Sequence, residues 1–285
     1  MNKFDNISKP LMWSTTLLLA AIVAGCGGGG SGTSGPGLGP VGAACSGTGC
    51  VDLGTAANYA ILAKTGVSSV PNSVVTGNVG LSPAARGFLT GWALIAEPTD
   101  TSFGSAQVSG RLFAADNVGG TTSSNLSTAV GDMQTAYTNA NGLAPAGGGD
   151  PAAGGVACPT DGTTVGALGN VTITPGVYTC TVPLSIAAGT NVTLSGAGVY
   201  VIRTSAGITQ AAGTQVILTG GAVAQNVFWV PAQTASIGGA AGTTTKMAGV
   251  ILAKTNITIG TNATVNGRLL AQTAVTLDQA TVAQP

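Results

Sequence analysis

The stretch from Ala248 to Val282 contains one short unit written twice, and this repeat restricts the folds open to the chain. The segment Lys254–Ile259 (KTNITI) aligns without a gap with Gln272–Leu277 (QTAVTL), at an offset of 18 residues (272 − 254). Apolar β-forming residues that return at so short a period, with Gly or Asn-Gly at the joints, are typical of the stacked turns of a β-solenoid. We therefore expect the rest of the chain to form further turns of the same coil or to be attached to it.

A third copy of the unit lies near the start of the chain. Residues 60–68 (AILAKTGVS) match residues 250–258 (VILAKTNIT) without a gap. This similarity predicts that N-terminal and C-terminal strands come together in one coil. Elsewhere, short runs rich in Val, Ile and Thr are separated by Gly, Pro or Asn, as short solenoid strands require. These expected strands are Val171–Ile173, Val177–Thr179, Val192–Leu194, Val199–Ile202, Val216–Leu218 and Val227–Val230.

One segment, Thr121 to Ala144, has the pattern of an amphipathic helix. Its apolar residues Leu126, Val130, Met133 and Tyr137 recur at the 3.6-residue period, and three alanines widen the same stripe. Ser or Asn at positions 123–125 supplies candidate N-caps, and Asn-Gly at 141–142 supplies a stop. We expect this single helix to lie along one flank of the coil and to cover part of its surface.

The composition argues against several classes of function. Only 6% of the 285 residues are charged, the formal net charge is 0, and there is no histidine. Without a basic patch to neutralise phosphates, nucleic acid is not the expected partner. Without histidine, a Ser-His-Asp triad is impossible and the commonest general base is missing.

A polysaccharide-cleaving enzyme is the catalytic alternative for a β-solenoid, and that chemistry needs two nearby carboxylates. Among the acidic residues, only Glu97 and Asp100 are close in sequence. They belong to a Pro-containing polar run, which is more typical of a turn. We therefore expect no catalytic residue.

The first 26 residues form the expected export signal. Lys3 and Lys9 precede a short apolar run, Leu17–Val23, and Val23–Cys26 (VAGC) resembles the bacterial lipobox, in which the cysteine is lipidated. An ordinary secretory signal or a short membrane anchor is the alternative, but the apolar run is too short to span a bilayer comfortably. We expect a lipid at Cys26, a Gly/Ser-rich tether at 27–50 and a folded domain at 51–285. The expected location is the outer membrane or cell surface, or the extracellular space if the protein is released.

Export permits disulfides. Apart from Cys26, the cysteines are Cys45, Cys50, Cys158 and Cys180, which allow three connectivities. Proximity favours Cys45–Cys50 and Cys158–Cys180. The latter pair has neither metal-site spacing nor histidine partners, so a structural disulfide is the better interpretation.

The order of several motifs along the chain resembles the bacterial and fungal ice-binding protein family defined by the DUF3494 domain. The similarity covers roughly Leu53 to Val282 and includes NYAILAKTGVSSVPNSVVTGNVG, GRLFAADN, STAVGDMQTAYTNA, ITPGVY, NVFWV and GVILAKTNITIGTNATVNGRLLAQTAVTL. It implies a mainly β fold: a discontinuous right-handed β-solenoid of triangular section with one long α-helix packed alongside. It also implies a monomer that needs no cofactor or metal, has no catalytic activity, and binds ice through a flat face to slow growth and recrystallisation.

Strand alternation identifies the residues that would form such a face. Ile257, Ile259, Val275 and Leu277 should point into the core, so their neighbours point outward. Stacked strands place outward residues about 4.8 Å apart between strands and about 6.6 Å apart along a strand. The expected ice-binding residues are Gly66, Ser68, Thr209, Thr234, Ser236, Asn256, Thr258, Ala274 and Thr276.

The ice-binding motif of the family resembles Thr-Ala/Gly-x-Thr/Asn, and the chain follows it unevenly. Residues 273–276 (TAVT) fit, 255–258 (TNIT) depart at the second position, 65–68 (TGVS) depart at the fourth, and 234–237 (TASI) fit poorly. These departures predict moderate activity. Thr, Val and Ile also suit any strand, so a cell-surface adhesin or a structural β-solenoid without ice activity is the alternative.

Overall fold

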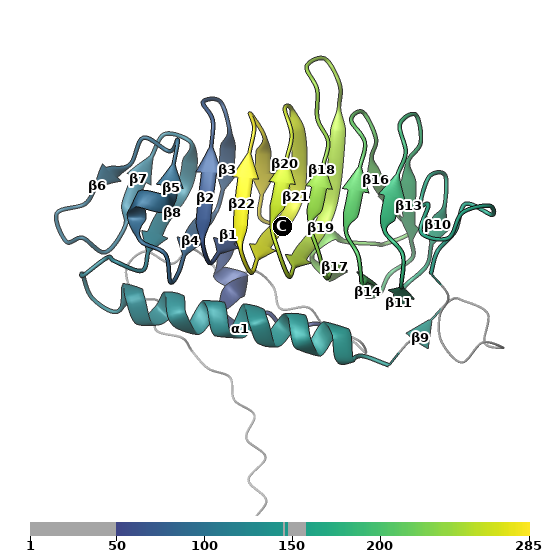
Figure 1. Ribbon diagram of the computed structural model, residues 1–285, viewed down its shortest axis with the longest axis horizontal. Coiled ribbons are helices and arrows are strands. Elements are labelled where there is room, and N and C mark those ends of the chain that lie inside the picture. Colours follow the sequence, from purple (N-terminus) through teal and green to yellow (C-terminus); the bar gives the residue numbers. More distant parts are fainter. Residues whose placement is uncertain (1–49, 145, 148–157) are drawn as a thin grey trace, which may run out of the picture. The chain divides into compact units, whose positions relative to one another are not determined.

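Parallel strands in three sheets, with a single α-helix, account for most of residues 50–144, 146–147 and 158–285, which the computed structural model describes (Figure 1). The helix is α1, Thr122–Gly142, and short 3-10 turns occupy Gly54–Asn58, Arg86–Phe88 and Ala224–Asn226. The expected mainly β fold with one helix is confirmed. Cys26, Cys45 and the tether lie outside the described residues.

The largest sheet has 13 strands in the order β1-β4-β8-β3-β23-β21-β19-β17-β14-β11-β9, with β7 paired to β8 and β6 paired to β7. Its pairs are parallel except β6–β7, β7–β8 and β9–β11. The strands are β1 Tyr59–Ala63, β3 Val74–Thr76, β4 Asn78–Leu81, β6 Ile95–Ala96, β7 Phe103–Ser105, β8 Val108–Ala114, β9 Ala146–Gly147, β11 Gly176–Cys180, β14 Tyr200–Thr204, β17 Val227–Pro231, β19 Thr245–Ala253, β21 Ala263–Ala271 and β23 Thr281–Ala283.

The two smaller sheets are parallel throughout. The three-stranded sheet runs β10 (Thr172–Ile173), β13 (Val192–Ser195), β16 (Val216–Thr219). The seven-stranded sheet runs β12 (Leu184–Ile186), β15 (Ile208–Gln210), β18 (Ala235–Ile237), β20 (Ile257–Ile259), β22 (Ala274–Leu277), β2 (Gly66–Ser69), β5 (Leu89–Thr90). From β10 to β18, successive strands along the chain therefore belong to different sheets. From β18 to β23 they alternate between the seven-stranded and the largest sheet, whereas β3 and β4, and β6 to β8, follow one another within the largest sheet.

The repeat seen in the sequence sets the strand register. Ile257 is paired with Val275, and β19 pairs with β21 over nine residues at the same 18-residue offset, from Thr245↔Ala263 to Ala253↔Ala271. The N-terminal copy stacks next, because β1 pairs with β21 and β2 pairs with β22. The prediction that N-terminal and C-terminal strands come together is confirmed.

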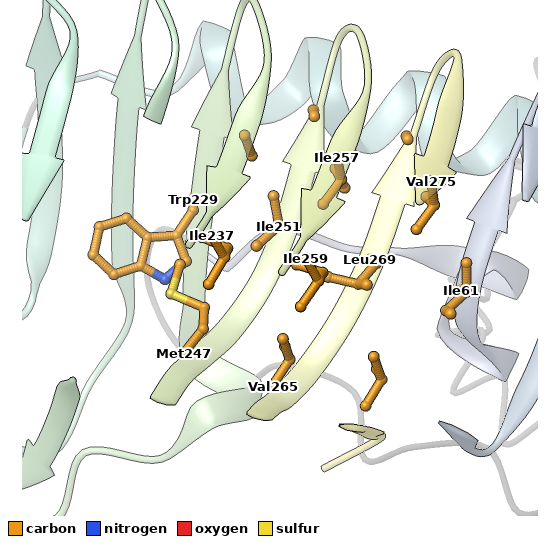
Figure 2. Packing of buried hydrophobic residues seen from close by; sticks show 14 of the residues in the cluster. Ile61, Trp229, Ile237, Met247, Ile251, Ile257, Ile259, Val265, Leu269 and Val275 are labelled. Carbon is orange, nitrogen blue, oxygen red and sulfur yellow. The ribbon is translucent and has the colours of Figure 1, made fainter. Parts of the chain in front are cut away.

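The principal core lies between the sheets, where side chains from successive strands meet (Figure 2). Ile257, Ile259, Val275 and Leu277 are fully buried there, as the alternation predicts. Trp229 fills the same core and donates its indole N–H to the carbonyl oxygen of Ala248 at 2.9 Å.

A second core lies between α1 and the outer side of the largest sheet. Alternate residues of one strand serve the two cores: Val227 and Trp229 point inward, while Phe228 and Val230 meet the helix. This explains why the strand VFWVP is apolar at every position. The predicted stripe of α1 is confirmed as its buried face, comprising Leu126, Ala129, Val130, Met133, Ala136, Tyr137 and Ala140.

Residues outside the helix hold α1 at its middle and at its C-terminal end. The backbone N–H and hydroxyl of Thr55 both donate to Asp132, at 2.7 and 2.6 Å. At the C-terminal end, Arg203 donates to the carbonyl oxygens of Ala140 and Asn141 at 2.9 and 2.8 Å. The N-cap expected at 123–125 is wrong, because the cap position is residue 121, which makes no side-chain capping bond.

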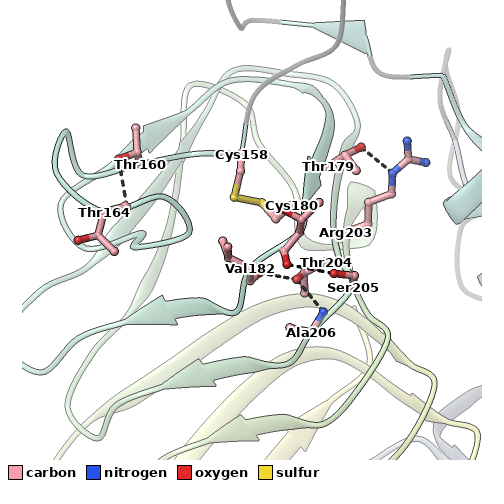
Figure 3. The surroundings of a disulfide bond; sticks show 11 residues. Cys158, Thr160, Thr164, Thr179, Cys180, Val182, Arg203, Thr204, Ser205 and Ala206 are labelled. Atoms are coloured by element: carbon pink, nitrogen blue, oxygen red, sulfur yellow. Dashed lines mark hydrogen bonds between the residues drawn. A yellow bond between two sulfur atoms is a disulfide. The ribbon is translucent and has the colours of Figure 1, made fainter.

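The seven-stranded sheet is closed at its β12 edge by a segment that a disulfide fixes. Cys158 and Cys180 are bonded, which confirms the predicted pair (Figure 3). Beyond the bond, the backbone of residues 166–168 pairs with Ser185 of β12. Cys50 is also disulfide-bonded, and its predicted partner Cys45 lies outside the described residues.

At the opposite edge, a charged cluster fixes the segment that carries β5. The Arg86 guanidinium bonds to Asp116 at 2.8 Å and to Asp100 at 3.1 Å, and lies 4.8 Å from the Phe103 ring centroid. Its hydrogen bond holds the pKa of the Asp100 carboxyl below its usual value. The β12 end of the sheet is thus covered by residues 166–168, and the segment before β5 is held in place at the other end.

Candidate functional site

The outer face of the seven-stranded sheet carries an unbroken row of hydroxyl side chains. The pairing register places one Ser or Thr from every strand opposite its neighbour on the next strand. In spatial order the row is Ser185, Thr209, Ser236, Thr258, Thr276, Ser68 and Thr90. The residues on either side of each hydroxyl are buried in the core, with Gly91 after Thr90 as the exception, a residue of positive φ at which the chain turns away.

A second outward row runs beside the first, at the positions two residues earlier. Gly66 faces Ala274 in the ladder, and the carbonyl oxygen of Asn256 accepts from the N–H of Ala235 on the neighbouring strand. A Cβ added at Gly207 would lie 3.4 Å from the Thr234 hydroxyl oxygen, so these two positions are adjacent. In spatial order the row is Pro183, Gly207, Thr234, Asn256, Ala274, Gly66 and Phe88. Apart from Phe88, its side chains are short.

Most hydroxyls of the first row are free to bind water. Ser68 donates to the Thr276 hydroxyl oxygen at 3.1 Å. Among the described residues, this is the one hydrogen bond in which a side-chain hydroxyl of the first row takes part. Neither row carries an ionisable group. Asp278, two residues beyond Thr276, is the nearest exposed charge along β22 and accepts from the Thr261 hydroxyl at 2.7 Å.

The structure brings all nine predicted site residues together on this face. Ser68, Thr209, Ser236, Thr258 and Thr276 belong to the first row, and Gly66, Thr234, Asn256 and Ala274 belong to the second. Sequence reasoning missed Ser185 and Thr90. Ser185 could have been found from its sequence, because the triplet LSI at 184–186 has the same apolar-hydroxyl-apolar pattern as ITI at 257–259.

The other two outward surfaces differ from this face. Packing of α1 covers much of the largest sheet. On the third surface, which the three-stranded sheet shares with the first halves of β19 and β21, Lys246 lies in the outward row beside Thr264 and Thr281. Ile217 and Val74 also project there, with 37% and 49% of their surfaces exposed. A charge and large apolar groups thus interrupt that surface.

The acidic pair considered for catalysis is engaged in ion pairs. Glu97 contacts Arg111 and accepts from Ser102, while Asp100 is bound by Arg86. Across the ranges that the structure describes, no three Cys, Asp or Glu side chains gather as metal ligands would. Within those same ranges, no helix has both the length and the apolar character needed to cross a membrane.

Comparison with known proteins identifies relatives over nearly the whole described part of the chain. The family model described as ice-binding-like matches residues 61–283. An ice-binding protein of Typhula ishikariensis, K1-A, is 43% identical over 210 residues, covering 72% of this chain and 77% of the relative. An ice-binding protein of Flavobacterium frigoris is 38% identical over 244 residues, covering 82% and 76%.

Solved structures agree with this assignment. An ice-binding protein from an Arctic yeast, LeIBP, whose structure is described as a basis for antifreeze activity, superposes with a TM-score of 0.73 at 35% identity, covering 84% of this chain and 96% of that one. The ice-binding domain of Shewanella frigidimarina gives a TM-score of 0.66 at 26% identity, covering 82% and 96%. The chain therefore belongs to the ice-binding-like family.

Proposed function

We propose that the protein adsorbs to ice through the outer face of the seven-stranded sheet and thereby slows the growth and recrystallisation of ice. The observation that carries this proposal is the row in which each of seven neighbouring strands presents one hydroxyl residue. Relatives described as ice-binding proteins, with more than 35% identity over most of their length, support the activity itself.

The geometry of a stacked parallel sheet suits a crystalline ligand. Backbone hydrogen bonds fix neighbouring strands about 4.8 Å apart, and alternate residues along a strand lie about 6.6 Å apart. The hydroxyl and methyl groups therefore form a regular two-dimensional grid. Such a grid holds water at positions set by the backbone, and that ordered layer can merge with a crystal surface.

Threonine side chains suit this task better than longer polar side chains. Their β-branch leaves few χ1 rotamers, so they lose little conformational entropy when they bind. Buried neighbours such as Ile257 and Ile259 fix the backbone on both sides of Thr258. Adsorption of this kind involves no bond-breaking step, so the proposal requires no catalytic residue, metal or cofactor.

We propose further that the three sheets are the sides of a right-handed, discontinuous β-solenoid of triangular section, and that the protein acts as a monomer. The alternation of successive strands among three sheets and the insertion of C-terminal strands beside N-terminal ones support this description. A crystal structure would test the handedness and the triangular section. Sedimentation as a single species of monomer mass in analytical ultracentrifugation would test the oligomeric state.

An ice-recrystallisation assay with two tyrosine variants tests the function and the face. In Thr258→Tyr and Thr276→Tyr, a bulky ring would break the flat surface while the strand backbone stays paired. We expect both variants to lose most of the activity of the parent and to keep its circular dichroism spectrum. Thr264→Tyr is the matched control, because Thr264 is an exposed strand threonine on the third surface. It should remain fully active.

The outcomes separate the alternatives. An inactive parent protein would reject ice binding and favour an adhesin or a structural role for the sheet. An active parent whose activity survives both substitutions on the seven-stranded sheet, but not Thr264→Tyr, would move the ice-binding face to the third surface.

We also propose that the protein is exported and anchored by a lipid at Cys26, with residues 27–50 as a tether. The supporting pattern is VAGC at 23–26 after a short apolar run. Because Gly27 replaces the aspartate associated with retention in the inner membrane, the outer membrane is the proposed location. Metabolic labelling with a fatty acid should mark the parent and leave Cys26→Ser unlabelled. Material found only in the medium would count against the anchor.

A further inference from the structure

Phe88 is the largest side chain in the two outward rows of the candidate face, and it stands at one end of them. It immediately precedes β5, and the pairing of Val67 with Leu89 places it opposite Gly66. A Cβ added at Gly66 would lie 4.0 Å from the Cβ of Phe88. The Phe88 side chain therefore leaves the backbone on the same side of the sheet as the second row.

The Phe88 ring does not lie flat on its neighbour. Within 4 Å of the position that a Cβ at Gly66 would occupy, the only Phe88 atoms are its carbonyl oxygen and its Cβ. The side chain belongs to neither apolar core, and 59% of its surface is exposed. An aromatic ring that neither packs inward nor covers the adjacent glycine projects into solvent beside a surface of short side chains.

The backbone that carries this ring is held from two sides. The N–H of Arg86 donates to Asp116 at 2.7 Å, and the Arg86 guanidinium binds Asp116 and Asp100. The N–H of Phe88 donates to the carbonyl oxygen of Ala85 at 3.0 Å, and the next side chain, Leu89, is buried. The ring therefore has a fixed base, and an approaching flat crystal cannot displace it by moving a loose loop.

From this geometry we infer that Phe88 bounds the ice-contact area, so that β5 and its Thr90 are kept out of contact although Thr90 continues the hydroxyl row. A flat lattice that touches the short side chains of β22 and β2 meets the ring before it reaches Thr90. The effective face then ends at Ser68 on β2. This inference rests on the proposed function, and it adds a residue that sets the width of the contact.

The test compares three variants of the full protein in the ice-recrystallisation assay, with Thr276→Tyr as a reference for loss. Thr90→Tyr should keep the activity of the parent, because its strand does not reach the ice. Phe88→Ala should lower the minimum inhibitory concentration by about twofold or more, since it adds a strand to the contact. The double variant Phe88→Ala/Thr90→Tyr should lose that gain. Thermal unfolding of each variant establishes that β5 is still folded.

The possible failures can be told apart. If the parent shows no activity, the proposed function fails and this inference with it. If the parent is active and Thr276→Tyr is not, a strong loss in Thr90→Tyr would place β5 in the contact and overturn the inference alone. Reduced or unchanged activity in folded Phe88→Ala would also overturn it, since the ring would then be a contact group or have no effect.

Discussion

Removing the guanidinium of Arg203 should destabilise the protein without affecting the proposed ice-binding face. Arg203 extends from β14 toward the C-terminal end of α1 and is only 7% exposed. It donates to the carbonyl oxygens of Ala140 and Asn141 at 2.9 and 2.8 Å, and to the Thr179 hydroxyl at 2.8 Å. Burial lowers the pKa of Arg203, yet an arginine remains charged at neutral pH.

The magnitude follows from what Arg203→Met would leave behind. The variant keeps most of the apolar volume but removes three hydrogen bonds from a charged donor, and it leaves the Ala140 carbonyl oxygen buried without that partner. Such an unpaired group costs about 1–3 kcal/mol, and loss of a cation at a helix C-terminus costs about 0.3–1 kcal/mol more. Relief from burying a guanidinium offsets part of this, so we expect a net loss of about 2 kcal/mol. For a domain of this size, that loss lowers the melting temperature by about 4–8 °C.

Thermal unfolding followed by circular dichroism measures this loss, and the ice-recrystallisation assay provides the second readout. Thr179→Val is the matched control, because it removes only one acceptor, at an exposed residue, and should cost about 1 kcal/mol or less. Near 0 °C, far below either melting temperature, Arg203→Met should inhibit recrystallisation as well as the parent. A melting temperature equal to that of the parent would refute the helix-capping argument. Normal folding with lost ice activity would refute the separation of the helix-covered side from the ice-binding face.

Three further predictions concern the ends of the sheet and its close contacts. Because the folded pKa of Asp100 is lowered chiefly by its hydrogen bond from Arg86, its contribution to stability is present above the usual pKa of about 4 and is lost as pH falls through the lowered value. The melting temperatures of the parent and Arg86→Gln should therefore converge as the pH falls below about 4, and a constant difference would contradict this. Replacing both Cys158 and Cys180 by serine should cost about 3 kcal/mol, because it opens the loop that the bond closes in the unfolded chain, between residues 22 apart, and so raises the entropy of the unfolded state. An unchanged midpoint in denaturant would count against this. Gly267→Ala should prevent folding, because its Cβ would lie 1.8 Å from the Gly249 carbonyl oxygen. Gly131 is an exposed residue of α1 with no atom within 4 Å of an added Cβ, so Gly131→Ala should stabilise the protein by up to about 1 kcal/mol in the same thermal unfolding experiment.

Where side-chain direction follows from local alternation, the sequence was sufficient to predict it. The 18-residue offset in the C-terminal repeat became the pairing of Ile257 with Val275, and the matching N-terminal copy became the neighbouring strand. The helix and its buried stripe followed from the 3.6-residue period. All nine predicted face residues point outward on one sheet because a strand that buries every second residue has no alternative.

Strand order and long-range contacts could not be obtained in this way. The spacing between successive strands of the face changes from repeat to repeat, so no fixed offset leads from Thr209 back to Ser185. Thr90 belongs to a strand of two residues that is too short to show alternation. The hydrogen bond from Arg203 to the end of α1 joins residues that are 63 positions apart in the sequence, and no local pattern indicates such a contact.

The order of the face therefore originates in buried residues behind it. None of the row hydroxyls is positioned by a long side chain, and the one hydrogen bond within the row joins two neighbouring strands. The spacing of Thr258 and Thr276 is set by the backbone ladder, and that ladder is fixed by the buried Ile, Val and Leu on either side of each threonine. Departures from the family motif, such as Ser68 and Asn256, consequently alter the chemistry of single grid points while the grid itself is preserved. Substitutions in the row should therefore reduce activity gradually, whereas a register shift of one residue would turn every hydroxyl into the core and abolish both fold and activity.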